Sequence, residues 1–109
     1  MQFPFITGSR AYGIPTEDSD IDLVLPPNTN TEFKKTLVGF SDDREIPVKY
    51  GRLNLILTNE LKQWELWLQA TNELIAMKPV TREFAVEYIT KLFKSYGLAK
   101  SIAYDEDPN

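Results

Sequence analysis

The sequence contains neither cysteine nor histidine among its 109 residues. Without cysteine, disulfides and thiolate metal sites are excluded. Without histidine, the chain lacks the commonest general base near neutral pH and the imidazole ligands of transition metals. Any metal ion must therefore be held by oxygen atoms, and oxygen ligands favour Mg²⁺ or Mn²⁺.

Basic residues are also scarce, with 12 lysines and arginines against 16 aspartates and glutamates and a net charge of −4. Because they are scattered, we expect no broad nucleic-acid-binding face, while local basic contacts to a nucleotide remain open. The sequence shows no signal-peptide pattern and no apolar run long enough to span a membrane. We therefore expect a cytoplasmic protein with no membrane partner.

Length and composition indicate one small globular domain. A chain of 109 residues has room for one core but not for a second, substrate-binding domain. Its hydrophobic content of 42% is ordinary for a folded protein and too high for a disordered one. We expect the domain to span residues 1–103 and to be followed by a frayed acidic tail over residues 104–109.

Two aspartates placed two positions apart in an apolar segment, Asp20 and Asp22, are the most informative feature of the sequence. Residues i and i+2 of a strand point to the same face, so both carboxylates point one way while Ile21, Leu23 and Leu25 point into a core. Two adjacent carboxylates repel each other unless a cation joins them. Mg²⁺ usually binds one or two carboxylates together with substrate phosphates. The pair therefore predicts a metal site.

A short polar segment, Gly8-Ser9, precedes the aspartate pair by ten residues. Its backbone N–H groups and its hydroxyl suit phosphate oxygens. The next residue, Arg10, has a guanidinium group that can pair with phosphate through two parallel hydrogen bonds. The segment is therefore a candidate phosphate-binding loop.

Taken together, Ile6-Thr7-Gly8-Ser9 and, after ten residues, Asp20-Ile21-Asp22-Leu23 resemble the signature of the nucleotidyltransferase superfamily. This superfamily includes DNA polymerase beta, kanamycin nucleotidyltransferase, the CCA-adding enzymes and the minimal nucleotidyltransferase antitoxins. The segment looks most like the small, single-domain bacterial and phage members, and residues 50–56 and 79–83 also look like the small phage-encoded versions. The signature covers about 18 residues in a specific order and spacing.

The resemblance implies a metal-dependent enzyme that transfers a nucleoside monophosphate from an NTP to a hydroxyl group of a protein or RNA acceptor. It implies that Asp20 and Asp22 are catalytic and hold Mg²⁺ or Mn²⁺. The nucleotide would be bound by Gly8, Ser9, Arg10 and Ser19. Since the chain has no added domain, the acceptor would bring its own contacts.

The sequence departs from the family pattern at the third acidic residue, which relatives carry on a neighbouring strand. The best matching strand, residues 53–57, places Asn54 at the expected third-ligand position. Asparagine offers a carbonyl oxygen, but it has no charge and cannot accept a proton from an attacking hydroxyl. Asp43 or Glu45 can substitute if the strand order brings one of them in. A non-catalytic nucleotide-binding or partner-binding module of phage or accessory type is therefore the alternative to an enzyme.

The apolar patterns predict an α+β fold, a small mixed sheet with helices on one face, compatible with the polymerase beta-like nucleotidyltransferase fold. In that fold we expect the metal carboxylates on the open side of the sheet. The expected strands are residues 2–7, 19–25, 45–50 and 52–57, with a loop or single helical turn over 10–16. Three helices are expected. The first is capped by Asn30 or Thr31 and runs to about residue 38, and the second is capped by Thr58 or Asn59 and runs to about residue 77. The last is capped by Thr81 and ends at residue 97.

Two tryptophans, Trp64 and Trp67, need a choice between core packing and base stacking. Trp64 and Trp67 lie on an apolar stripe at helical spacing, and Tyr88 lies on the apolar face of the last helix. Large apolar residues in such a stripe are usually buried. We therefore expect all three in the core between the last two helices and the sheet.

Overall fold

The fold is an α+β arrangement seen in a computed structural model that describes residues 2–28, 49–50 and 52–100. Its strands are β1 (Phe5–Thr7), β2 (Ile21–Leu25), β3 (Lys49–Tyr50) and β4 (Leu53–Leu57), and its helices are α1 (Ser9–Tyr12), α3 (Leu61–Met77) and α4 (Arg82–Ser95). The helix expected up to residue 38, the residues Asp43 and Glu45, and the tail over residues 104–109 lie outside the described residues.

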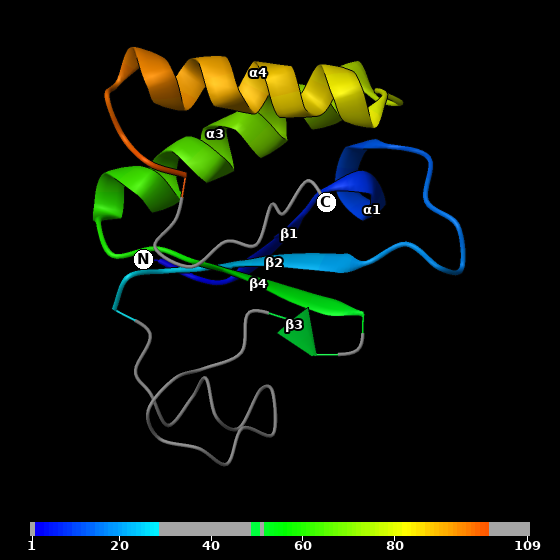
Figure 1. Ribbon diagram of the computed structural model, residues 1–109, viewed down its shortest axis with the longest axis horizontal. Helices are drawn as coiled ribbons and strands as arrows, with labels where there is room; N and C mark the ends of the chain where they lie inside the picture. Colours follow the sequence, from blue (N-terminus) through cyan, green and yellow to red (C-terminus); the bar gives the residue numbers. More distant parts are fainter. Residues whose placement is uncertain (1, 29–48, 51, 101–109) are drawn as a thin grey trace.

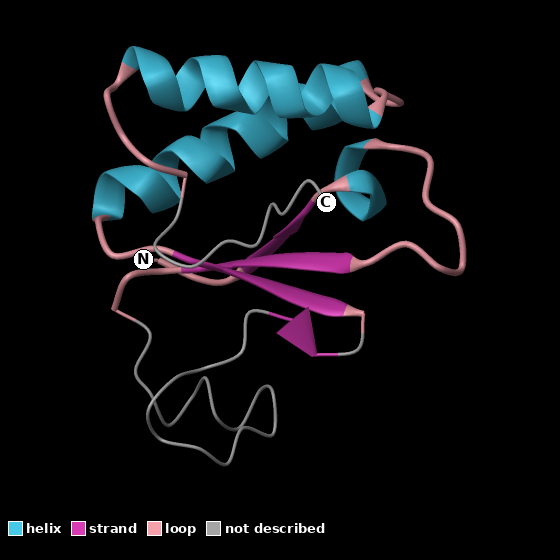
Figure 2. Ribbon diagram, in the orientation of Figure 1, coloured by secondary structure: helices cyan, strands magenta, loops and turns pink. Residues whose placement is uncertain are grey.

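The strands form a mixed sheet in the order β1-β2-β4-β3. β1 runs antiparallel to β2, β2 runs parallel to β4, and β3 is antiparallel to β4. Helices α3 and α4 lie together on one side of this sheet (Figures 1 and 2). The expected mixed sheet with helices on one face is therefore confirmed for the described part of the chain. No helix in that part is both long and apolar enough to cross a membrane.

Alternation along β2 and β4 separates two apolar clusters. Val24 and Ile56 belong to the cluster that includes the α3 and α4 core residues, whereas Leu25 and Leu55 belong to a second cluster. Asp22 is two residues before Val24, so it shares the helix-covered face. The expectation that the metal carboxylates face the open side of the sheet is therefore wrong for Asp22. Both faces of β2 carry apolar residues, so alternation alone did not show which face the helices cover.

Helix α3 supplies much of the core through its two tryptophans. Trp64 is 6% exposed and Trp67 is 3% exposed, which confirms the prediction for both rings. Tyr88 of α4 is only partly buried, and it packs against this cluster while its hydroxyl donates to Glu73. Leu61, the first residue of α3, is 44% exposed.

The helix termini follow local hydrogen-bonding rules. The Thr81 hydroxyl accepts a hydrogen bond from the N–H of Phe84 at 3.1 Å, so the predicted cap of α4 is confirmed. The expected caps of α3 were wrong, because Glu60 occupies that position. Thr58 is instead buried, and its hydroxyl donates to the carbonyl of Leu25 at 2.7 Å, which ties β4 to β2.

Candidate functional site

The carboxylate of Asp22 lies directly against the backbone of Gly8. Gly8 follows β1 and has φ +79°, a conformation that residues with a Cβ atom rarely adopt. A Cβ atom on Gly8 would be 2.9 Å from the carboxylate carbon of Asp22. The pairing of Thr7 with Asp22 between β1 and β2 fixes this approach. The glycine is therefore needed both for its backbone conformation and for the room it leaves.

Asn54 lies on the other side of Asp22, because β2 and β4 pair in register at these two residues. Its side-chain N–H donates to Oδ1 of Asp22 at 3.2 Å. This amide orientation is favoured since the opposite one would bring two oxygen acceptors together. Asn54 is only 7% exposed, and its Oδ1 atom has no hydrogen-bond partner within the described part of the chain. A buried acceptor in that state costs about 1–3 kcal/mol unless a ligand satisfies it.

Buried hydroxyl groups surround the base of the site. The hydroxyls of Thr7 and Thr71 are 2.7 Å apart and link β1 to α3. Tyr12 of α1 is 6% exposed. Burial raises the pKa of the Tyr12 phenol, the Asp22 charge raises it further, and the hydroxyl of Thr7 acts in the opposite direction. The Tyr12 phenol is therefore neutral at ordinary pH. Sequence reasoning missed these hydroxyls, although Thr7 and Tyr12 fall inside the signature segment.

Asp20 stands immediately before β2, which begins at Ile21. The N–H of Ile21 donates to the carbonyl of Arg52 at 2.7 Å, so the start of β2 is tied to the start of β4. Asp20 and Asp22 line one cavity with Ser9.

Of the two further residues expected to bind the nucleotide, Ser19 lines the cavity and Arg10 does not. The hydroxyl of Ser19 accepts a hydrogen bond from the N–H of Thr16 at 2.8 Å, and Ser19 lines the cavity. The guanidinium group of Arg10 instead donates to the carbonyls of Thr16, Glu17 and Ser19. The structure therefore brings Gly8, Ser9, Ser19, Asp20, Asp22 and Asn54 to one cavity, while the guanidinium of Arg10 is engaged by the neighbouring loop.

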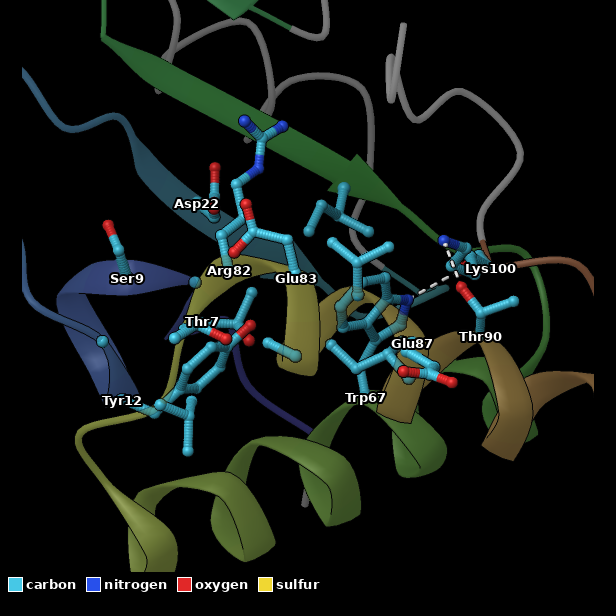
Figure 3. A pocket seen from close by; sticks show the side chains of 18 of the residues that line it. Thr7, Ser9, Tyr12, Asp22, Trp67, Arg82, Glu83, Glu87, Thr90 and Lys100 are labelled. Carbon is cyan, nitrogen blue, oxygen red and sulfur yellow. Dashed lines mark hydrogen bonds between the residues drawn. The ribbon is translucent and has the colours of Figure 1, made fainter. Parts of the chain in front are cut away.

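The cavity is a groove of about 1350 Å³ between the sheet and α4. Figure 3 shows Ser9 and Asp22 toward one end of it and Thr90 and Lys100 toward the other. The wall opposite the sheet comes from α4, which contributes Arg82, Glu83, Glu87, Lys91 and Lys94. Sequence reasoning did not assign these residues to the site, and the only signal for them was the likeness of residues 79–83 to the small phage-encoded proteins.

The donor atoms near Asp22 are oxygens that fit a hard divalent cation. They are the carboxylates of Asp20 and Asp22, which line one cavity and are the ligand chemistry that Mg²⁺ and Mn²⁺ prefer. The amide of Asn54 turns its N–H toward Asp22, so its carbonyl oxygen would reach a cation bound at Asp22 only after the amide rotates. No group of three acidic side chains placed to hold a metal occurs within residues 2–28, 49–50 and 52–100. The described residues thus offer two anionic ligands and one neutral ligand, and phosphates or water would complete the coordination.

The fold and the site together define a small α+β protein with a carboxylate–amide pair above a glycine turn. Comparison with protein-family models, curated proteins and solved structures finds no significant match to this chain. The likeness to nucleotidyltransferases therefore rests on the signature residues of the sequence alone, and membership of that superfamily is a proposal.

Proposed function

We propose that this protein is a metal-dependent nucleotidyltransferase that transfers a nucleoside monophosphate from an NTP to a hydroxyl group of a protein or RNA acceptor. The observation that carries the proposal is the position of Asp22. Its carboxylate lies against Gly8, next to the amide of Asn54, in a groove that Asp20 and Ser9 also line.

The cation would be held by Asp20 and Asp22, with the carbonyl oxygen of Asn54 as a neutral ligand once the amide rotates from its hydrogen bond to Asp22. When bound, it would neutralise the charge of the phosphates and lower the pKa of the acceptor hydroxyl. In the transfer, the acceptor oxygen bonds to the α-phosphorus, the bond from that phosphorus to the β-phosphate oxygen breaks, and pyrophosphate and the hydroxyl proton leave.

The chain's own residues supply binding and orientation. The space that a side chain on Gly8 would fill is taken by the carboxylate of Asp22, and Ser9, next in the chain, lines the groove beside it. On the opposite wall, Arg82 in the first turn of α4 can balance phosphate charge. The groove volume of about 1350 Å³ leaves room for part of an acceptor beside an NTP.

One observation favours the second candidate, a non-catalytic binding module. The residue paired with Asp22 across the parallel strands is Asn54, and the described residues supply no third carboxylate there. Such a site would bind a metal–nucleotide complex with little or no transfer, because the missing charge weakens activation of the hydroxyl.

The experiment that separates the two candidates uses the whole chain with Mg²⁺ or Mn²⁺, NTPs labelled at the α-phosphate or the γ-phosphate, and RNA or protein acceptors. We expect the α label, and not the γ label, to appear on an acceptor. The variant Asp22→Asn keeps the size of the side chain and is expected to abolish transfer. Metal-dependent NTP binding without transfer would support the binding module. Absence of both binding and transfer would exclude the enzyme and the nucleotide-binding module.

A further inference from the structure

The loop between α1 and β2 is held by one guanidinium group. Nε of Arg10 donates to the carbonyl of Ser19 at 3.1 Å, and Nη2 of Arg10 donates to the same carbonyl at 3.0 Å. The same Nη2 atom donates to the carbonyl of Thr16 at 3.0 Å and to that of Glu17 at 3.4 Å. Three carbonyls therefore converge on one cation. Hydrogen bonds from a charged donor are stronger than those from a neutral one.

These contacts join the two halves of the candidate site. Arg10 follows Ser9 directly in α1, so its backbone is continuous with the glycine turn. The carbonyl group of Ser19 belongs to the peptide bond that leads into Asp20. A hydrogen-bonded connection therefore runs from the turn at Gly8, through the Arg10 side chain, to the carbonyl of Ser19 next to Asp20.

A second arginine holds the same loop from outside. Arg52 donates to the carbonyl of Glu17 and forms an ion pair with Asp18 at 3.1 Å. The side chains of this ion pair are 56% and 90% exposed, so solvent screens it strongly. Its hydrogen bonds involve Glu17 and Asp18, not the carbonyl of Ser19. Arg52 is therefore a suitable control for the effect of Arg10 on Asp20.

We propose that Arg10 is a positioning residue, which fixes Asp20 relative to the turn at Gly8 and Ser9 and does not itself bind phosphate. This inference rests on the proposed function for the role of Asp20 as a metal ligand. It also explains why an arginine suits this position. A planar guanidinium spreads its donors over several carbonyls in fixed directions, whereas the ammonium of lysine is a single point of charge on a flexible chain.

The test compares Arg10→Gln and Arg10→Lys with Arg52→Gln in the full-length chain. Hydrogen exchange of the peptide covering residues 13–20 measures the loop, and electron paramagnetic resonance of Mn²⁺ without nucleotide measures the metal site. We expect Arg10→Gln to speed exchange in this loop and to weaken Mn²⁺ binding by about tenfold or more. Arg10→Lys should fall between Arg10→Gln and the wild type, and Arg52→Gln should change Mn²⁺ binding less than about threefold.

A direct phosphate contact gives a different pattern. If Arg10→Gln leaves binding of Mn²⁺ alone unchanged but weakens binding of Mn²⁺ with NTP, Arg10 is a phosphate ligand and the positioning role is wrong. Unchanged hydrogen exchange in both Arg10 variants would also overturn it. If the wild-type chain binds neither Mn²⁺ nor Mn²⁺ with NTP, the proposed function fails, and hydrogen exchange alone then decides whether Arg10 holds the loop. Should Arg10→Gln not fold, Arg10→Lys takes its place in each comparison.

Discussion

Gly8 and Asp22 are in contact through a glycine backbone and a carboxylate, with no room for a side chain between them. The contact results from the antiparallel pairing of β1 and β2, which places Thr7 opposite Asp22 and brings the following turn against the carboxylate. It joins the two halves of the signature segment in space, although ten residues separate them in the sequence. The predictions below test this site and the fold that supports it.

Replacing Gly8 with alanine should damage both the fold and the site. The residue has φ +79° and ψ −165°, a region that is accessible almost only to glycine, and a Cβ atom there would overlap Asp22. We expect Gly8→Ala to lower the free energy of unfolding by about 2–4 kcal/mol, as measured by urea denaturation, and to abolish metal–nucleotide binding.

Gly97 provides a matched control for this substitution. It also has a positive φ, of +66°, but a Cβ atom there would meet nothing within 4 Å. Gly97→Ala should therefore cost only the backbone term, about 1–2 kcal/mol, and leave the site unchanged. Equal losses in the two variants would show that the contact with Asp22 adds nothing.

Changing Asn54 to aspartate tests the missing carboxylate. The amide N–H that Asp22 now accepts from would be replaced by a like charge about as close as the present 3.2 Å. Without metal we expect Asn54→Asp to be destabilised by about 1–3 kcal/mol, because buried acceptors would face each other. With Mn²⁺ we expect tighter binding than in the wild type, recovery of stability, and a gain in nucleotide transfer if the protein is an enzyme.

The comparison for this variant is Asn54→Ala, which removes the amide without adding charge. Thermal unfolding with and without Mn²⁺ measures both variants. If Mn²⁺ stabilises Asn54→Asp no more than Asn54→Ala, the side chain at this position does not reach the cation, and Asn54 is not a third-ligand position.

The pH dependence of stability should contain a contribution from Tyr12. Burial raises the pKa of its phenol in the folded state, so the unfolded chain loses the Tyr12 proton at lower pH than the folded chain does. This contribution is fully present below pH ~10, the pKa of an unperturbed tyrosine, and is lost as the pH rises through the folded-state pKa. The wild type should therefore lose stability above pH ~10 more steeply than Tyr12→Phe.

Tyr88 must be controlled in that measurement, since its hydrogen bond to Glu73 also raises its pKa. Tyr88→Phe should change the alkaline slope independently of Tyr12→Phe, because the two tyrosines occupy different surroundings. A Tyr12→Phe variant with the same slope as the wild type would mean that the Tyr12 phenol is accessible to solvent.

Truncation of Trp64 should be among the most destabilising changes in the chain. The ring is 6% exposed, its N–H donates to the carbonyl of Phe3 at 2.9 Å, and it packs edge-on against Phe3 and Phe5. We expect Trp64→Ala to cost about 3–5 kcal/mol in chemical denaturation. Trp64→Phe, which keeps a ring but loses the hydrogen bond, should cost less. A loss below about 1 kcal/mol for Trp64→Ala would contradict the buried position.

Local patterns were sufficient for much of the fold. Periodicity predicted α3 and α4 and the burial of Trp64 and Trp67. Apolar residues at helical spacing lie on one side of a helix, and that side packs against the core. The hydroxyl of Thr81 was recognised as a cap since capping needs only residues three positions apart. The expected α+β class with a mixed sheet followed from the order of these elements.

Other features depended on strand order and on long-range contacts. The helix-covered face of β2 was mistaken because Val24 and Leu25 are both fully buried, one on each side of the sheet. When both faces of a strand are apolar, the local sequence pattern does not show which face the helices cover. The sequence analysis also missed that α4 forms a wall of the groove. Arg82 and Glu83 look like ordinary residues of an exposed first turn, and only the position of α4 relative to the sheet shows that they line the groove.

The sequence by itself determined only local features: it places Asp20 and Asp22 two positions apart and puts a residue without a side chain at Gly8, and two-residue alternation and glycine's backbone freedom are local properties. Only the tertiary structure decided what surrounds them. It placed the amide of Asn54 beside Asp22 through strand pairing, and it turned Arg10 toward the carbonyl of Ser19. A guanidinium group binds carbonyls and phosphates with the same donors, so the partner of Arg10 depends on which acceptors the folded chain brings to it.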